Sequence, residues 1–250
     1  MAMFRAGLLL AVLLLCGGAG PMMTTDKTAA IRRVAVMSAV GDKFTVRKIG
    51  ITVFGNDEKA FPIDAWGIDQ FVVNKMRSVL ARRFEVRPVA YHKSAFLNAR
   101  NESIFPNAAR DEDAIAAGVR AQAKAADIDA YIVVTPATSP FGISKQSLRG
   151  LGILNLPPSL VEAKAYLFAL YQVAVVDGHS FTVIANSPAI LVSQDTVLAT
   201  TSIRGPARAV DESWMPATLD AAHNIRLKSA ITELLDRNLP RTIENMRLLQ

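Results

Sequence analysis

The order of apolar and polar residues predicts strands and helices that alternate along most of the chain. The run 33–40, Arg-Val-Ala-Val-Met-Ser-Ala-Val, is almost wholly apolar, as in a mostly buried strand. Gly41 and Asp42 form a turn signal, and residues 44–54 predict a second strand. Two neighbouring strands joined by a short turn indicate a hairpin at the start of the fold.

An amphipathic helix is predicted next, from Pro62 onward, with Asp64 as its N-cap. Its apolar residues recur at spacings of three and four, which places them on one helical face. They are Ile68, Phe71, Val72, Met76, Val79 and Leu80. We expect this face to form part of the core.

The middle of the chain repeats the order of strand and helix. Residues 84–90 alternate apolar and polar, and Pro88 within them favours a sheet edge or a strand end. The acidic run 111–113 opens an Ala-rich helix that is expected to reach about Ala126. The β-branched cluster within 127–135 then predicts a central strand.

The last third of the chain predicts a hairpin and a helix. An apolar strand is expected over 163–176, followed by a turn at Asp177-Gly178 and a returning strand over 181–185. Residues 219–239 have the periodicity of an amphipathic helix, which Pro240 breaks or restarts. The whole order predicts a single mixed sheet with helices packed on it, in the α/β class with α+β as the alternative, and a long C-terminal hairpin before a terminal amphipathic helix.

The first twenty residues predict export from the cytoplasm. Arg5 precedes an apolar run over 8–15, and small residues follow it up to Ala19, which is the layout of a secretory signal peptide. The run is too short to span a bilayer comfortably. We therefore expect a signal peptide over 1–20, a tether over 21–30, and one domain with a C-terminal helical extension over 31–250.

Cys16 is the single cysteine, and it leaves two routes of processing open. It lies where a bacterial lipoprotein carries its acylated cysteine, and the segment resembles a lipobox although Leu15 stands where Gly, Ala or Ser is usual. Lipidation would attach the chain to a membrane, and Gly17 after the cysteine resembles an outer-membrane address. The alternative is ordinary cleavage after Ala19, which discards Cys16.

Composition and charge fit a globular domain of the periplasm. The chain is 51% hydrophobic and 20% charged, and its net charge of +6 comes from scattered basic residues. Such a surplus is typical of a solvated surface, with anionic lipid or another envelope polyanion as the alternative partner. Export makes nucleic acid an unexpected partner. With no cysteine beyond Cys16, neither a disulfide framework nor a thiolate metal site is available.

Four segments resemble a group of bacterial envelope proteins. They are Arg33-Val-Ala-Val-Met, Arg83-Phe-Glu-Val-Arg, Ala125-Ala-Asp-Ile-Asp-Ala-Tyr-Ile-Val-Val and Tyr171-Gln-Val-Ala-Val-Val-Asp-Gly-His-Ser-Phe-Thr-Val-Ile-Ala. Over about 31–190 the chain is similar to the curli-secretion lipoprotein CsgG, the TolB amino-terminal domain and the lipoprotein activators of penicillin-binding proteins. The resemblance implies an α/β fold, an envelope setting and action by assembly or by binding other proteins, with a homo-oligomer as one form of assembly. It carries over no catalytic residue.

The sequence predicts no catalytic, cofactor-binding or metal-binding residue. The three histidines, His92, His179 and His223, are far apart and lack the spacing of metal ligands. The local motifs of common hydrolases and nucleotide enzymes do not occur, and Gly150-Leu-Gly152 lacks the third glycine of a dinucleotide loop. The acidic run 111–113 is explained by helix capping, and the acids at 127 and 129 by a connection between helix and strand.

Residues 148–158 form the candidate interaction loop. The segment is interrupted by glycine and proline, yet it is too apolar for an ordinary solvated loop. Some part of the structure or a partner must shield its apolar side chains from water, namely those of Leu151, Ile153, Leu154 and Leu156. Either they fold back on the core of the domain as a lid or an extra edge strand, or they form an exposed apolar patch that contacts a partner or a membrane.

These observations predict a non-enzymatic, exported protein of the bacterial envelope that acts through contacts with envelope proteins as an assembly or accessory factor. The alternative is an envelope hydrolase whose site is assembled from residues distant in sequence. A subunit of a secretion pore is a third class. It is disfavoured because the stretch 138–162 is barely long enough for two membrane-crossing strands and does not alternate cleanly.

Overall fold

The computed structural model describes residues 30–50, 56–97, 108–123, 127–140, 146–156, 165–189, 203–216 and 223–250. The predicted signal peptide, Cys16 and the predicted tether up to residue 29 lie outside the described residues.

The described strands form two five-stranded sheets and a small two-stranded one. The first sheet has the order β11 (Val183–Pro188), β10 (Tyr171–Asp177), β5 (Ala130–Pro136), β1 (Arg33–Ser38) and β4 (Glu85–Arg87). The second has the order β12 (Ala207–Val210), β9 (Ala165–Ala169), β8 (Leu151–Asn155), β2 (Lys43–Lys48) and β3 (Asp57–Pro62). The third pairs β6 (Thr138–Pro140) with β7 (Ser147–Arg149). The mixed α/β class is confirmed, and the expectation of a single sheet is wrong.

The chain divides into two sheets because it changes pairing partners in the middle of apolar runs. The predicted strand 163–176 is two strands that meet at Leu170, with β9 in the second sheet and β10 in the first. At this corner the N–H of Leu170 donates to the carbonyl of Gly150 (2.8 Å), and its carbonyl accepts from the N–H of Ala137 (3.0 Å). Every residue of 165–176 is buried, so hydrophobicity alone could not mark the division.

The predicted hairpin of the first two strands is also wrong. β1 pairs in parallel with β4 and β5, whereas β2 pairs antiparallel with β3 and parallel with β8. The charged residues 57–59 form an edge strand, where charged side chains discourage pairing with other chains. The hairpin of β10 and β11 is confirmed.

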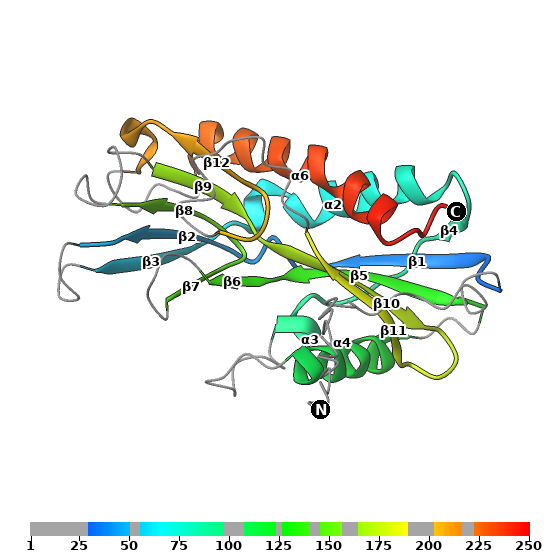
Figure 1. The fold of residues 1–250 in the computed structure, drawn as a ribbon. Coiled ribbons are helices and arrows are strands. Elements are labelled where there is room, and N and C mark those ends of the chain that lie inside the picture. Colours follow the sequence, from blue (N-terminus) through cyan, green and yellow to red (C-terminus); the bar gives the residue numbers. More distant parts are fainter. Residues whose placement is uncertain are drawn as a thin grey trace, which may run out of the picture.

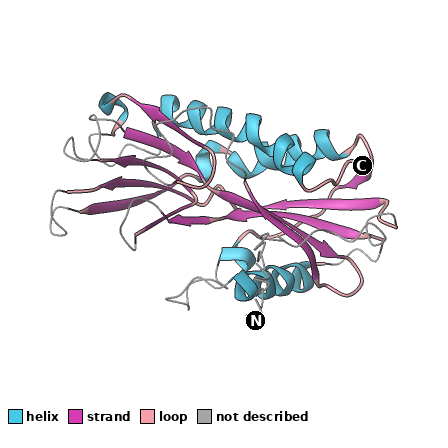
Figure 2. Cartoon of the chain, viewed as in Figure 1, coloured by secondary structure: helices cyan, strands magenta, loops and turns pink. Residues whose placement is uncertain are grey.

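Helices lie on both faces of the sheets (Figures 1 and 2). α2 (Ile68–Leu80) and α6 (Ile225–Asn245) share one face, and their apolar residues join those of both sheets in the main core. α3 (Ser94–Leu97) and α4 (Ala108–Gln122) lie on the opposite side, where Phe96, Ile115 and Val119 join Ala35, Met37 and Val133 of the first sheet in a second core. Two 3₁₀ turns, η2 (Asp64–Trp66) and η4 (Glu212–Trp214), complete the described elements.

The two long helices confirm their predicted apolar faces. In α2 the stripe is buried except for Phe71, which is only partly covered. The expected cap differs: Asp64 belongs to η2, and Gly67 stands before α2 without a side-chain cap bond. α6 begins after Asn224, whose Oδ1 accepts from the N–H of Leu227 (3.1 Å), and it continues through Pro240. No helix among the described residues is long and apolar enough to cross a membrane.

Candidate functional site

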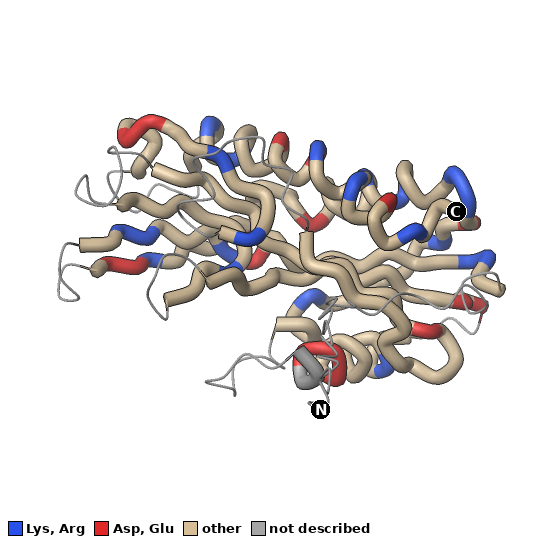
Figure 3. The backbone as a smooth tube through the Cα atoms, in the orientation of Figure 1, with Lys and Arg blue, Asp and Glu red and all other residues tan. Residues whose placement is uncertain are grey.

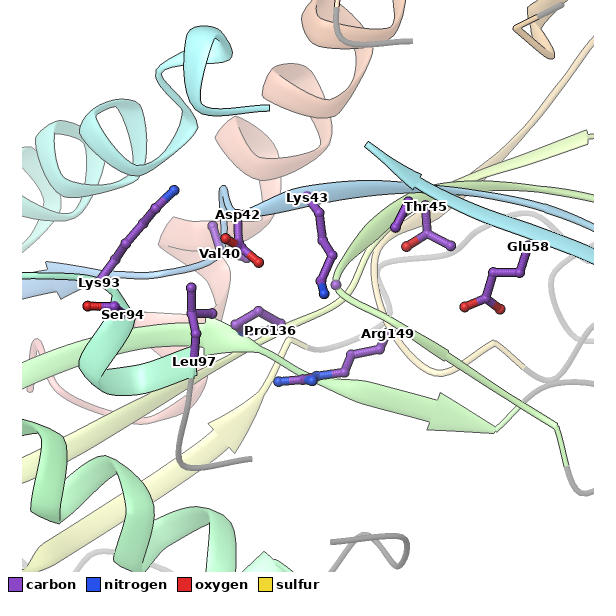
Figure 4. Close-up of a pocket in the computed structure, with 12 residues that line it drawn as sticks. Val40, Asp42, Lys43, Thr45, Glu58, Lys93, Ser94, Leu97, Pro136 and Arg149 are labelled. Carbon is purple, nitrogen blue, oxygen red and sulfur yellow. The ribbon is translucent and has the colours of Figure 1, made fainter. Parts of the chain in front are cut away.

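A cleft of about 480 Å³ opens near the point where β1 leads into β2, and none of the residues that line it belongs to α2 or α6. Its walls come from the β1–β2 connection, the β2–β3 pair, the ends of β5 and β7, and α3 with the residue before it (Figure 4). Charged side chains of both signs line it, namely Asp42, Lys43, Glu58, Lys93 and Arg149. We call this the junction cleft.

The pleat of β2 explains why one wall of the junction cleft is polar. Phe44 points into the main core and lies against Trp66, with ring centroids 5.3 Å apart. Its neighbours Lys43 and Thr45 therefore point to the opposite face, where both line the cleft. The register pairs Thr45 with Ala60 of β3, which continues the same wall.

Arg47 fixes the outer part of this wall. Its Nη1 lies 3.2 Å from Oε2 of Glu58 and donates to the carbonyl of Ser147 (2.7 Å), while its Nη2 donates to Oε1 of Gln146 (2.8 Å). One guanidinium thus ties β2 to its neighbour β3 and to the start of β7. The position of Glu58 in the cleft wall is set by this network.

Lys93 supplies the charge on the α3 side. Its ammonium contacts the carboxylate of Asp64, lies 3.8 Å from Oδ2 of Asp69 and donates to the carbonyl of Gly41 (3.4 Å). Burial opposes the charged form of Lys93, but the hydrogen bond that its ammonium donates to Asp64 and the nearby carboxylates outweigh it and raise the lysine pKa. The same hydrogen bond lowers the pKa of Asp64. Lys93 is therefore a fixed cation at neutral pH.

A hydrogen-bonded hub behind Lys93 holds the junction between β1, α2 and the segment before α3. Oδ1 of Asp69 accepts from Oγ of Ser38 (2.7 Å) and from the N–H of Gly41 (3.0 Å). The hydroxyl of Tyr91 accepts from the N–H of Ser38 (2.9 Å) and donates to its carbonyl (3.1 Å). Burial raises the pKa of Tyr91.

Residue 41 must be glycine for this junction to close. A Cβ at Gly41 would lie 2.9 Å from Cβ of Ile68 and 3.1 Å from the backbone nitrogen of Asp69. Both atoms belong to the first turn of α2 and cannot move without shifting the helix. The turn signal in the sequence therefore marks a close approach of two backbones.

The four residues of the candidate interaction loop lie inside the fold. Leu151, Ile153 and Leu154 belong to β8 and Leu156 follows it, and the exposed fractions of these residues are 1%, 0%, 0% and 6%. β8 lies between β9 and β2 in the second sheet, so it is an inner strand. The prediction of an exposed apolar patch is therefore wrong. As in the alternative prediction, these residues lie in the core, but they form an inner strand and not a lid or an edge strand.

The glycine that interrupts this segment has a packing role. A Cβ at Gly152 would lie 2.4 Å from the carbonyl oxygen of Thr45 and 2.5 Å from Cζ of Phe168. The aromatic ring on β9 thus occupies the space that a side chain at 152 would need. Both faces of β8 are buried, which explains why its sequence lacks the alternation of a half-buried strand.

The histidines are not gathered in the junction cleft. His92, His179 and His223 are exposed, and none of them lines the cleft. His179 lies in the predicted turn, where Oδ1 of Asp177 accepts from the N–H groups of His179 (3.0 Å) and Ser180 (2.7 Å). Within the described ranges, no three His, Cys, Asp or Glu side chains come together in a way that could hold a metal ion.

Asp129 joins two strands that are distant in the sequence. Its Oδ2 accepts from the N–H groups of Arg32 (2.9 Å) and Arg33 (2.8 Å). Partial burial opposes the charged form, but these hydrogen bonds and the guanidinium of Arg33 outweigh it and lower the pKa of Asp129. The carboxylate fixes the start of β1 against the start of β5.

Sequence reasoning missed the residues of the junction cleft. The alternation of Lys43, Thr45 and Arg47 around Phe44 was a signal for one polar strand face. Nothing in the sequence pairs that face with Arg149 or Lys93, because the β2–β8 pairing and the contact between Lys93 and Asp64 join distant segments. The assembled cleft offers fixed charges of both signs, which suits a polar ligand or a polypeptide.

Comparisons with known proteins assign the chain to no family. No family model matches it, and no curated protein is significantly similar. Among solved structures, the PelC dodecamer from Paraburkholderia phytofirmans aligns with 10% identity over 90% of this chain and 93% of that one, with a TM-score of 0.29. Protein XCC0632 from Xanthomonas campestris, described as DUF330, aligns with 8% identity over 92% of each chain and a TM-score of 0.28. The hypothetical protein CT253 from Chlamydia trachomatis has 14% identity over 84% and 98% and a TM-score of 0.25. The three families suggested by the sequence stay a prediction.

Proposed function

We propose that the chain is an exported protein of the bacterial envelope that acts by contacting other proteins, and that the junction cleft is its contact site. The observation that carries this proposal is the charged lining of the cleft, in which Lys93 and Glu58 are already engaged in ion pairs with residues of the same chain. Ion pairs of this kind hold the charged groups in position, which suits recognition. Catalysis would instead need a group free to exchange a proton.

Lys43 is the cation that we expect to meet the partner. Its side chain is exposed in the cleft wall, and no ion pair holds it within the part of the chain that the structure describes. A carboxylate of a partner polypeptide would complement it. Thr45 and Ala60 continue the cleft wall beside it, so side chains of a partner segment can enter the cleft next to Lys43.

The envelope setting rests on the predicted signal peptide and on the resemblance noted from the sequence. Attachment through a lipid on Cys16 and assembly with further copies of the chain belong to the same proposal. The hydrolase alternative would use Ser94, a hydroxyl that lines the cleft next to Lys93 in the sequence.

Site-specific crosslinking in living cells tests the proposal. A photoreactive residue is placed at Ala60 in the cleft wall, and a matched one at Ser229, an exposed position of α6. We expect one adduct with an envelope protein from position 60, its loss when Lys43→Glu is added, and no such adduct from position 229. Equal adducts from both positions would overturn the cleft as the contact site. Hydrolysis of an ester or peptide substrate that Ser94→Ala abolishes would favour the enzyme.

A further inference from the structure

Four arginines gather at the end of the molecule where the first strand begins and the last helix ends. We call this the arginine end and define it as Arg32, Arg82, Arg83 and Arg247. Figure 3 shows basic segments around the C-terminus and beside the start of β1. The four residues come from three parts of the sequence, so the cluster exists only in the folded chain.

Hydrogen bonds connect these three parts directly. The N–H of Glu85, just after the loop that carries Arg82 and Arg83, donates to the carbonyl of Arg32 (2.9 Å). Nη1 of Arg83 donates to the carbonyl of Leu248 (2.8 Å), next to Arg247. The start of β1, the end of α2 and the end of α6 therefore meet at one end of the fold.

The charge of the arginine end is largely uncompensated. Arg32, Arg82 and Arg247 are exposed, and none of them forms an ion pair within the described residues. The neighbouring acids form ion pairs with other arginines. Oε1 of Glu85 lies 2.7 Å from Nη2 of Arg87, and Oδ1 of Asp129 lies 3.4 Å from Nη2 of Arg33. The last turns of α6 add one exposed acid, Glu244, and one exposed cation, Arg241.

Arg247 occupies a position where glycine is the usual residue. Its φ of 55° is left-handed, and it follows α6 in the pattern of a Schellman cap: its N–H donates to the carbonyl of Glu244 (2.9 Å), and the N–H of Leu248 donates to that of Ile243 (3.3 Å). Glycine adopts this conformation without steric cost, whereas arginine does not. The chain keeps a cation at a site where its backbone favours glycine, which points to a use for the charge.

From this geometry we infer that the arginine end binds an anionic membrane surface. The inference rests on the envelope setting of the proposed function. The described chain starts at the same end, because Ala30 precedes Arg32 by two residues. The predicted tether therefore joins the domain at the arginine end, and attachment at Cys16 would hold that end within about 55 Å of the bilayer, the length of some sixteen extended residues. Exposed guanidinium groups bind lipid phosphates through charge and paired hydrogen bonds.

Vesicle partitioning tests this inference with charge variants of the whole chain. The chain carries Cys16→Ser throughout, so that no lipid can be attached, and the readout is the ratio of binding to vesicles with 30% phosphatidylglycerol over binding to pure phosphatidylcholine. The ratio cancels apolar insertion of residues 8–15. The test variant is Arg32→Gln/Arg82→Gln/Arg247→Gln. The matched control is Lys48→Gln/Lys59→Gln/Arg204→Gln, which removes three exposed cations outside the arginine end.

We expect the parent to prefer anionic vesicles, with a preference that falls as salt is raised. Each arginine near an anionic surface should raise the binding ratio about five-fold. The ratio of the test variant should therefore be lower than that of the parent by on the order of 100-fold. The control should lose less than about five-fold, because its charges lie away from the bilayer. Equal losses in the two variants, or a parent without anionic preference, would overturn the inference.

Arg247→Gly separates binding from folding. Glycine adopts the left-handed conformation of residue 247 without steric strain, so the melting temperature should stay the same or rise. The vesicle ratio should fall about five-fold because one cation is lost. A ratio unchanged in Arg247→Gly would contradict a lipid-binding role for this residue. The vesicle ratio and the crosslink from position 60 are independent measurements. A negative result in one does not change the result expected in the other, so the two proposals can be contradicted separately. A charge-dependent adduct with an acidic protein at the arginine end, without vesicle preference, would replace the membrane by a protein.

Discussion

The hydroxyl of Tyr171 lies 3.1 Å from the hydroxyl of Thr242, and this buried hydrogen bond joins the first sheet to α6. Tyr171 opens β10 directly after Leu170, where the chain passes from the second sheet into the first. Oγ1 of Thr242 donates to the carbonyl of Asn238 (3.0 Å), so the phenol is the donor in its bond with Thr242. The bond therefore links α6 to the point at which the two sheets divide.

Removing the phenolic hydroxyl of Tyr171 should destabilise the fold without unfolding it. Tyr171→Phe should lower the free energy of unfolding by about 0.5–1.5 kcal/mol, because Thr242 keeps its bond to Asn238 and one neutral hydrogen bond is lost. Denaturant unfolding measures the change. A double-mutant cycle with Thr242→Val should give a coupling energy of at least about 0.5 kcal/mol, and a coupling near zero would contradict the bond.

The same tyrosine should limit stability at alkaline pH. Burial raises the pKa of Tyr171 above its ordinary value. A raised pKa in the folded state gives a contribution that is complete below the unfolded value of about 10 and is lost as the pH rises above it. The free energy of unfolding should thus fall with pH above about 10, less steeply in Tyr171→Phe. Equal slopes in the two chains would show that this phenol ionises freely in the folded state.

Asp129 should carry part of the acid sensitivity. The pKa of Asp129 is lowered in the folded chain, so its contribution is present above about pH 4 and is lost as the pH falls through the folded value. Asp129→Asn should cost about 1.5–3 kcal/mol at pH 7, and the difference from the parent should shrink toward pH 3. Asp127→Asn is the matched control, since Asp127 is 53% exposed and lies 3.8 Å from Arg33. It should change the free energy of unfolding by less than about 1 kcal/mol.

β8 should behave as core. Leu151→Ala should lower the free energy of unfolding by about 2–5 kcal/mol, because it leaves a cavity at a buried position of an inner strand. Ile225→Ala removes a side chain of similar size from a residue that is 78% exposed, and it should change stability by less than about 0.5 kcal/mol. If both variants unfolded like the parent, the burial of β8 would be contradicted.

Asp69 and Asp64 should differ in their effect on the junction. Asp69→Asn replaces a carboxylate that accepts from Ser38 and Gly41, and it should cost about 1.5–3 kcal/mol. The side chain of Asp64 is 66% exposed and caps no helix, so Asp64→Asn should cost less than about 1 kcal/mol. Thermal unfolding of the two variants in parallel measures the difference. A larger loss for Asp64→Asn would restore its role as an N-cap.

The elements that could be predicted from the sequence are those whose burial follows a local period. The stripe of α2, the central strand β5 and the β10–β11 hairpin each have their signal within one short window. Pairing between distant segments has no such signal. β2 pairs in parallel with β8 about 100 residues away, and the chain changes sheets at Leu170 inside an unbroken apolar run.

The candidate site was harder to predict for the same reason. Lys93 stands in a segment without periodicity, and its partner Asp64 was expected to cap a helix that begins later, after Gly67. The leucines of β8 lacked alternation because both faces of the strand are covered. Their apolar content predicted that these side chains are shielded from water. In the structure they are shielded because β8 is an inner strand with both faces buried.

The most direct test of the central claim is whether the junction cleft is covered in the cell. Because the chain has a single natural cysteine, Cys16, a cysteine placed at Ala60 or at Ser229 can be labelled with a membrane-impermeant maleimide and compared with the parent as background. The account predicts that Ala60→Cys is protected in intact envelopes and reacts fully after purification, whereas Ser229→Cys reacts fully in both. Equal labelling of Ala60→Cys before and after purification would show an empty cleft and would contradict a protein partner there.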